Sequence, residues 1–167
     1  SLGAGLGHYH QWLDNGRNTW IDADVPDVIA LRQHVIASAP PRRTNVAFDL
    51  TEPGWWARLG LPHGARGAPV LLICEGVLMY LTPSQVRDVL REVGQHAPPG
   101  TRLLCDALCW LAMGHANVHP SICHTHAEFR WGPRDWREFA AAHPRLHLHA
   151  EHDVMQGYGW PWSVTAP

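Results

Sequence analysis

Apolar residues recur along this chain with two different periods, and the two periods alternate. Short apolar stretches bounded by turn residues predict strands, whereas apolar positions three or four residues apart predict helices. The expected strands cover residues 18–24, 45–50, 70–74, 102–107 and 146–154. The expected helices cover residues 25–37, 51–59 and 133–142, and a further helix follows Thr82. Strands separated by helices predict a mostly parallel α/β sheet, here in a single domain spanning residues 1–167.

The helix after Thr82 has the clearest start signal in the chain. Thr82 is followed by Pro83 and, three residues on, by Gln85, which is typical of a helix that begins with a capping box. Its apolar positions at helical spacing are Val86, Val89, Leu90 and Val93. Between helices, residues 70–74 form a continuous apolar run, as expected of a strand covered on both faces.

Composition narrows the class of protein. The chain has 167 residues, of which 46% are hydrophobic and 17% charged, and a formal net charge of -2, which is a globular composition without a basic field for nucleic acid. No apolar run approaches the ~20 residues of a membrane span. The four cysteines, at uneven spacings, indicate reduced thiols in a cytoplasmic protein rather than a disulfide framework.

Parallel sheets bind ligands beyond the carboxyl ends of their strands, so residues there carry the candidate chemistry. The glycines of residues 2–7 would let a ligand approach the backbone, with N–H groups of the next helix free, although a plain glycine turn reads the same way. Asp24, with Asp22 as second choice, could accept ribose hydroxyls or simply favour a helix N-terminus. Asp49 could accept an adenine amino group while Leu50 packs on the ring, or Asp49 could cap a helix.

Glu75 follows the apolar run 70–74 directly, where burial of a carboxylate is costly unless it is paired. The sulfonium and ammonium groups of S-adenosylmethionine would suit it, and an ion pair with an arginine is the alternative. The first reading is favoured because four strand ends in order each carry a suitable group.

Five segments together resemble one family. They are Leu2-Gly3-Ala4-Gly5-Leu6, Asp24-Val25-Pro26-Asp27-Val28-Ile29, Asp49-Leu50-Thr51, Glu75-Gly76-Val77-Leu78-Met79-Tyr80-Leu81 and Phe129-Arg130-Trp131-Gly132. In sequence and spacing they resemble the leucine carboxyl methyltransferases, and more closely the tetracenomycin-type polyketide O-methyltransferases. The resemblance runs from Ser1 to about Val154 and implies a Rossmann-like, three-layer class I fold.

The resemblance also implies a function. The family transfers a methyl group from S-adenosylmethionine to an oxygen, often a carboxylate, of an acceptor expected here to be a small molecule. The implied cofactor-binding residues are Gly3, Ala4, Gly5, Asp24, Asp49, Leu50, Glu75 and Gly76. In the family Gly3 and Gly5 line the methionine end, Asp24 matches the ribose acid and Glu75 faces the methionine moiety. Tyr80 matches a tyrosine near the transfer site and is the candidate catalytic residue.

The chain also departs from the family pattern. The family usually continues its glycine motif with Asp-Thr-Arg, where this chain has Gly7-His8-Tyr9. A first strand and a helical region normally precede the glycines, so the resemblance implies a domain incomplete at both ends. A degenerate, non-catalytic binding module is therefore the main alternative function.

Two further alternatives stay open. A nicotinamide-dependent oxidoreductase would share the glycines and the ribose acid but does not need Glu75. The loop holding His115, His119, Cys123, His124 and His126 could bind a metal, yet it shows no complete zinc signature, and no metal is expected. A phenol acceptor would need a base, for which His8, His10 and His115 are candidates.

Overall fold

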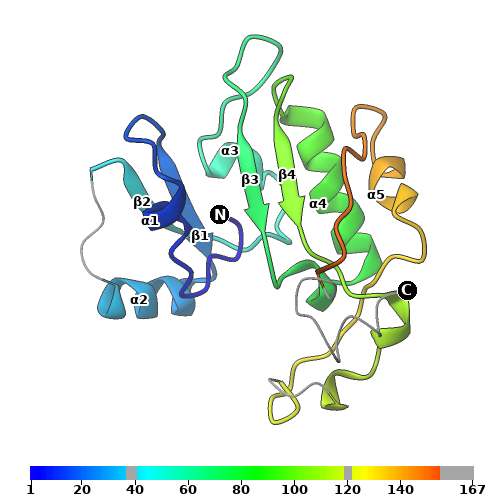
Figure 1. Ribbon diagram of the computed structural model, residues 1–167. Coiled ribbons are helices and arrows are strands. Elements are labelled where there is room, and N and C mark those ends of the chain that lie inside the picture. Colours follow the sequence, from blue (N-terminus) through cyan, green and yellow to red (C-terminus); the bar gives the residue numbers. More distant parts are fainter. Residues whose placement is uncertain (37–40, 119–121, 155–167) are drawn as a thin grey trace.

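The computed structural model describes residues 1–36, 41–118 and 122–154 (Figure 1). The strands are β1 (Trp20–Asp24), β2 (Arg43–Ala47), β3 (Leu71–Cys74) and β4 (Arg102–Cys105). The α-helices are α1 (Tyr9–Leu13), α2 (Pro26–Val35), α3 (Trp55–Arg58), α4 (Pro83–His96) and α5 (Arg137–Ala141). Short 3₁₀ helices are η1 (Leu78–Tyr80), η2 (Trp110–Ala112) and η3 (Ala116–Val118).

The strands pair in parallel, as the alternation of strands and helices predicts. β1 pairs with β2 from Trp20↔Arg43 to Asp24↔Ala47, and β3 pairs with β4 from Leu71↔Arg102 to Cys74↔Cys105. Each parallel partner is reached through a connection that contains a helix, because two parallel strands cannot be joined by a tight hairpin. In Figure 1 the arrowheads of β3 and β4 therefore point to the same edge.

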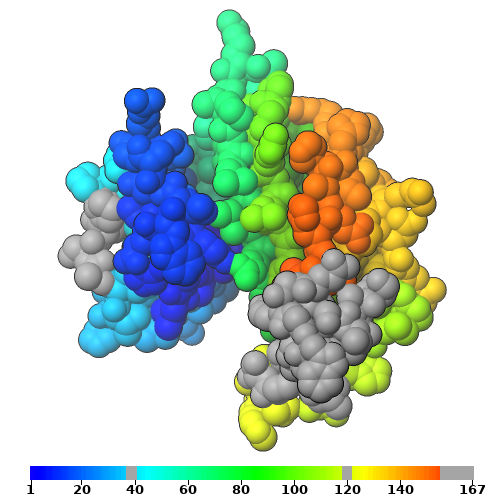
Figure 2. All heavy atoms as spheres, in the orientation of Figure 1, coloured from blue at the N-terminus to red at the C-terminus, as the bar shows by residue number. Residues whose placement is uncertain are grey.

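Residues 1–3 join the two pairs of strands. Leu2 forms a parallel bridge with Ala23 of β1, and its N–H donates to the carbonyl of Ile73 in β3 at 2.7 Å. The N–H of Ala23 in turn donates to the carbonyl of Ser1 at 2.9 Å. The spatial order is thus β2, β1, residues 1–3, β3, β4, and Figure 2 shows the N-terminal segment lying against the segment of β3.

The core lies between β3–β4 and the helices behind them. The apolar stripe of α4 packs with Leu72 and Cys74, whose side chains leave the same face of β3, and with Trp55 and Trp56 of α3. On the other face, Leu71 is 55% exposed and Leu104 is 61% exposed. Ile73, on that same face, is only 5% exposed, so the expected cover on both faces is present at Ile73 but not at Leu71. In the described ranges the β3–β4 pair carries helices on one face, a mixed α/β arrangement in which the expected three layers are not seen.

Two expected elements differ from the structure. The helix expected over residues 51–59 is reduced to α3, because Asp49 closes a turn on Thr51 and Gly54 takes a left-handed conformation with φ +78°. Residues 146–153 do not form the expected strand. The residue before them, Arg145, is bound to the end of α4, because its guanidinium donates to the carbonyls of Gln95 and Ala97. No helix in the described ranges is long and apolar enough to cross a membrane.

Candidate functional site

The carboxyl ends of the four strands gather acidic residues along one edge. Asp24 ends β1, and Asp49 lies two residues beyond β2. Glu75 follows β3 and Asp106 follows β4. Parallel register fixes this arrangement, because the strand-terminal pairs are Asp24↔Ala47 and Cys74↔Cys105. The sequence-predicted acids therefore share one edge of the strands, together with Asp106, which the sequence analysis missed.

The glycine loop, residues 3–7, follows the bridge at Leu2 and reaches this edge. Gly3 has φ +68° and Gly5 has φ +49°, a region that L side chains rarely adopt. A Cβ atom on Gly3 would lie 2.2 Å from the Cγ2 atom of Val77. Gly3 is thus required for two reasons, its backbone conformation and its close approach to the segment that follows Glu75.

The N–H groups of this loop are largely engaged within the protein. Those of Gly3 and Ala4 donate to the carbonyl of Ala23 at 2.8 and 3.1 Å, and that of Gly7 donates to the carbonyl of Ala4 at 2.9 Å. The loop is followed by α1, of five residues, which begins only at Tyr9. The expected free N–H groups belong to the next helix, and this helix starts two residues beyond the loop. The loop instead offers a surface without side chains at Gly3 and Gly5.

Asp24 is tied to the glycine loop. Its Oδ2 atom accepts the Gly5 N–H at 2.7 Å, and its Oδ1 atom accepts the Val25 N–H at 2.7 Å. The side chain is half-buried at the strand end. Each carboxylate oxygen can accept more than one hydrogen bond, so both retain capacity for a ligand hydroxyl.

Asp22, the second choice for the ribose acid, has a different environment. It is 3% exposed and receives hydrogen bonds from Arg32, Arg43 and Trp20. A carboxylate so enclosed stabilises the structure around β1 and is not available to a ligand. The two aspartates differ because Asp22 lies inside β1, whereas Asp24 lies at its end.

Asp49 and Leu50 occupy contrasting positions after β2. Asp49 is exposed, and its Oδ1 atom accepts hydrogen bonds from the N–H and the hydroxyl of Thr51 at 2.8 and 2.7 Å. Leu50 is buried in the core and also lines a concavity between this loop and α4. Asp49 thus shapes its own turn and does not cap α3, whose N-cap is Gly54.

Glu75 and Gly76 begin the segment after β3. Glu75 is exposed, contrary to the expectation of a buried carboxylate, and within residues 1–36, 41–118 and 122–154 it makes no hydrogen bond or ion pair. Gly76 has φ +68°, and its N–H donates to the Asp106 carboxylate at 2.8 Å. Asp106 therefore fixes the backbone beside Glu75 and leaves the Glu75 carboxylate free.

Tyr80 lies further along the same segment, in η1. It is half-buried, and its ring packs against that of Phe129 with centroids 5.9 Å apart. The Arg130 and Trp131 N–H groups donate to the Met79 carbonyl at 2.8 and 3.2 Å. Two segments that are far apart in the sequence but belong to the same family pattern therefore pack together.

A comparison with protein families identifies the family of this chain. The family model of leucine carboxyl methyltransferase matches residues 1–94, which is more than half of the chain. The chain belongs to the leucine carboxyl methyltransferase family.

Curated relatives in this family carry methyltransferase names. A tetracenomycin polyketide synthesis O-methyltransferase of Streptomyces glaucescens is 29% identical over 136 residues, 81% of this chain and 48% of the relative. An S-adenosyl-L-methionine-dependent methyltransferase of Gibberella zeae is 34% identical over 89 residues, 52% of this chain and 28% of the relative. A putative one of Parafrankia sp. is 36% identical over 87 residues, 49% of this chain and 27% of the relative. The chain thus spans about half or less of the length of these relatives.

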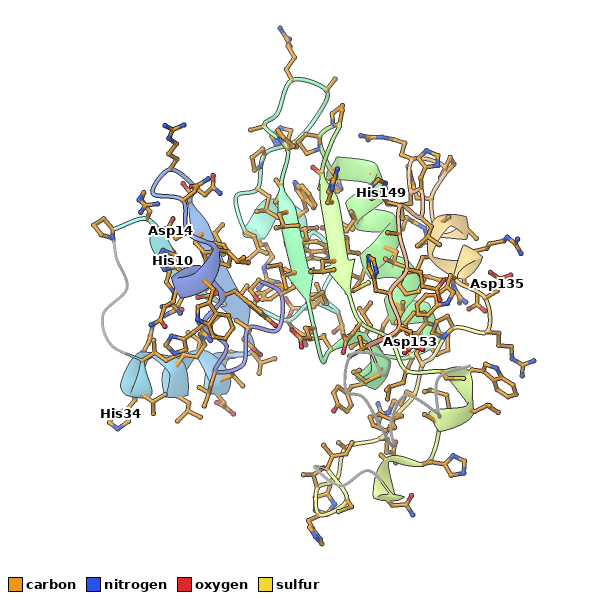
Figure 3. All side chains as sticks on the ribbon, viewed as in Figure 1. His10, Asp14, His34, Asp135, His149 and Asp153 are labelled. Atoms are coloured by element: carbon orange, nitrogen blue, oxygen red, sulfur yellow. The ribbon has the colours of Figure 1, made fainter. Side chains whose placement is uncertain are left out.

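Two of the three histidines that were considered as bases, His10 and His115, differ in their surroundings. His10 is buried on α1, where its Nε2 atom lies 3.6 Å from Asp14 and its ring meets Trp20 edge-on (Figure 3). His115 is exposed, and its Nδ1 atom lies 2.8 Å from the Met113 carbonyl. Among the described residues no three His, Cys, Asp or Glu side chains gather as metal ligands. His119 of the expected metal loop lies outside the described residues, so that alternative stays a prediction.

The sequence analysis missed Arg32 as well as Asp106. Arg32 is a fully buried residue of α2 whose guanidinium reaches the carbonyls of the glycine loop. Neither residue belongs to a motif that sequence reasoning singled out. A signal was nevertheless present, because Asp106 directly follows an expected strand segment and Arg32 interrupts the apolar face of an expected helix.

Proposed function

We propose that this chain binds S-adenosylmethionine along the carboxyl edge of its strands and provides the cofactor half of a methyltransferase acting on a small-molecule oxygen. The observation that carries the proposal is the contact between family motifs. The glycine loop is hydrogen-bonded to Asp24 and at the same time packs through Gly3 on Val77, two residues after Glu75. Membership of the family and the names of the relatives support the choice of cofactor.

The residues at this edge fit the chemistry of the cofactor. A loop without side chains at Gly3 and Gly5, with Ala4 between them, gives the methionine end access to the backbone. Asp24 retains acceptor capacity for ribose hydroxyls. Glu75, exposed and without an ion pair in the described part of the chain, supplies a negative charge for the sulfonium and ammonium groups.

In this proposal the loop after β2 binds the adenine end of S-adenosylmethionine. Asp49 is exposed and can accept the amino group, while Leu50 lines the adjoining concavity beside α4. Gly76 sits beside Glu75 without a side chain that could block access. The cofactor, when bound, supplies the activated methyl group, and the protein supplies binding and orientation.

The acceptor in this proposal is a carboxylate or a hydroxyl. A carboxylate is ionised at neutral pH and needs no base, whereas a hydroxyl does. Tyr80, half-buried just beyond Glu75 and Gly76, is the proposed residue near the transfer site. The Streptomyces relative is named for O-methylation in polyketide synthesis, which supports a polyketide-type acceptor.

Calorimetric titration of the chain with S-adenosylmethionine, S-adenosylhomocysteine and NAD tests the cofactor. We expect binding of the first two and none of NAD. Binding of NAD alone would favour the oxidoreductase and overturn the proposal. Binding of S-adenosylmethionine without turnover of a panel of carboxylic acids and phenols would leave a cofactor-binding module and remove the enzymatic part.

Glu75→Gln tests the charge partner of the cofactor. We expect affinity for S-adenosylmethionine to fall about tenfold, because a charged hydrogen-bonding partner is lost. Thermal stability should stay close to that of the wild type, since Glu75 is exposed. Asp135→Asn removes one exposed charge just before α5, away from the strand ends (Figure 3), and serves as the matched control. Equal affinities for both variants and the wild type would refute the role of Glu75.

A further inference from the structure

Arg32 is the most deeply buried charged residue of the described chain. Its exposed fraction is 0%, and it projects from α2 beneath the glycine loop. Its Nη1 atom donates to three loop carbonyls, those of Ala4 at 3.1 Å, Gly5 at 2.6 Å and Gly7 at 3.0 Å. Burial of a guanidinium is costly unless it is hydrogen-bonded, so these carbonyls and Arg32 depend on each other.

The charge of Arg32 is balanced only in part. Its Nη2 atom donates to the Oδ2 atom of Asp22 at 2.7 Å, and that same oxygen accepts a hydrogen bond from Arg43 Nε at 2.7 Å. Trp20 Nε1 donates to the other carboxylate oxygen at 3.0 Å. One carboxylate thus serves two guanidinium groups, and the dipoles of the loop carbonyls offset the remaining positive charge.

The three hydrogen bonds fix the direction of the loop peptides. In a trans peptide the C=O and the following N–H point in opposite directions. Because the Ala4 carbonyl points inward to Arg32, the Gly5 N–H points outward, where it donates to Asp24. By the same geometry the Gly5 carbonyl turns the Leu6 N–H away from Arg32.

We propose that Arg32 is a positioning residue that holds the glycine loop, and through the Gly5 N–H the Asp24 carboxylate, in the arrangement that receives the cofactor. This inference rests on the proposed function and adds a residue to it. Arg32 acts from below the loop and does not touch the cofactor.

Arg43 provides a matched control within the same network. It is buried, at 8% exposed, and its guanidinium donates to the same oxygen of Asp22. Among the described residues this is the only hydrogen bond of that guanidinium, which makes none to the loop carbonyls. A lysine at either position keeps the positive charge beside Asp22. At position 32 a lysine loses the planar fork that reaches the loop and Asp22 together, so Arg32→Lys and Arg43→Lys separate loop positioning from general stabilisation.

The test measures S-adenosylhomocysteine affinity by calorimetry and amide hydrogen exchange of the peptide covering residues 2–8. We expect Arg32→Lys to weaken binding at least tenfold and to accelerate exchange of that peptide at least tenfold. Arg43→Lys should change both by less than threefold, although both variants lower the melting temperature. Nitrogen-15 spectra of the wild type give a measurement without substitution, in which the Arg32 guanidinium protons should exchange slowly.

Each outcome bears on the inference. Equal effects of the two lysine variants on affinity would overturn it, because the whole network would then act only through stability. Unchanged loop exchange in Arg32→Lys, or fast exchange of the Arg32 guanidinium protons in the wild type, would also overturn it. A wild type that binds neither cofactor form refutes the proposed function, while the exchange measurements still decide whether Arg32 holds the loop.

Discussion

At the scale of single residues, Gly3 and Gly5 look alike in the sequence but not in the structure. Both have positive φ, yet only Gly3 faces a neighbour that an added Cβ would strike, since nothing lies within 4 Å of a Cβ on Gly5. The sequence shows two glycines of one motif. The contact with Val77 comes from the segment after β3, about seventy residues away, and no local pattern reveals it.

Alanine substitutions separate the two effects. Gly5→Ala should cost about 1–2 kcal/mol, the penalty of a left-handed residue. Gly3→Ala should cost a further ~1–3 kcal/mol, because the methyl group overlaps Val77 and the packing must shift. Urea unfolding followed by circular dichroism measures both. In the Gly3→Ala background, Val77→Ala should recover part of the additional loss. Equal losses for the two single variants would contradict the contact.

For the acidic residues, the sequence predicts their position at the strand ends but not the exposure of their side chains. Placement of Asp24, Asp49 and Glu75 at strand ends follows from the alternation of strands and helices, and the structure puts all three at one edge. Exposure does not follow in the same way. Glu75 is exposed, and the backbone beside it is held at Gly76 by the carboxylate of Asp106, which follows the neighbouring strand β4. That hydrogen bond joins positions thirty residues apart and could not be predicted from either segment alone.

At the scale of secondary structure, α4 is the element that the sequence predicts best. Its start depends on a local signal, the capping box between Thr82 and Gln85, and the structure contains both of its hydrogen bonds. Its apolar stripe also repeats with helical spacing and is buried. Elements whose ends depend on distant partners were predicted less well. Two backbone N–H groups at the start of α3 donate to Glu92 of α4, a contact that spacing does not reveal.

Removal of the cap tests how much the local signal contributes. Thr82→Ala deletes the oxygen that accepts the Gln85 N–H and should lower the free energy of unfolding by about 1 kcal/mol. Thr82→Ser keeps the hydroxyl and should restore most of that loss. Chemical denaturation with urea provides the measurement, at constant slope of the transition. A Thr82→Ala variant as stable as the wild type would show that packing of the apolar stripe alone fixes the start of α4.

At the scale of the whole molecule, the joining of the two strand pairs was not predictable. The alternation of elements indicates parallel strands but not which pair lies beside which. The answer depends on residues 1–3, whose backbone bonds Ala23 on one side and Ile73 on the other. One buried cluster then runs from Leu2 through Trp55 to Trp131. That cluster includes Cys74 and packs against Cys105. The ionisation of these two thiols therefore depends on whether the whole fold is intact.

The two thiols make stability depend on alkaline pH. Burial, followed by the proximity of Cys105 and Asp106, raises the pKa of Cys74 from 9.0 to about 12. Burial and Asp106 raise the pKa of Cys105 to about 11. Between pH 9 and these values the unfolded chain has lost thiol protons that the folded chain keeps. The unfolded state then binds fewer protons, so the free energy of unfolding falls as pH rises, whereas the contribution is fully present below pH 9.

Few other side chains titrate in the same range, because the chain has no lysine, 3 tyrosines and two further cysteines, Cys109 and Cys123. We therefore expect urea unfolding at intervals from pH 8 to pH 11 to show a decline in stability that is clearly smaller in a Cys74→Ala, Cys105→Ala double variant. Cys109→Ala is the control, since Cys109 is exposed and free, and it should retain the decline of the wild type. The comparison uses slopes with pH and not absolute stabilities, so the cavity left by each alanine does not enter. An undiminished slope in the double variant would mean that these thiols ionise in the folded protein as readily as in the unfolded chain, and that β3 and β4 do not bury them.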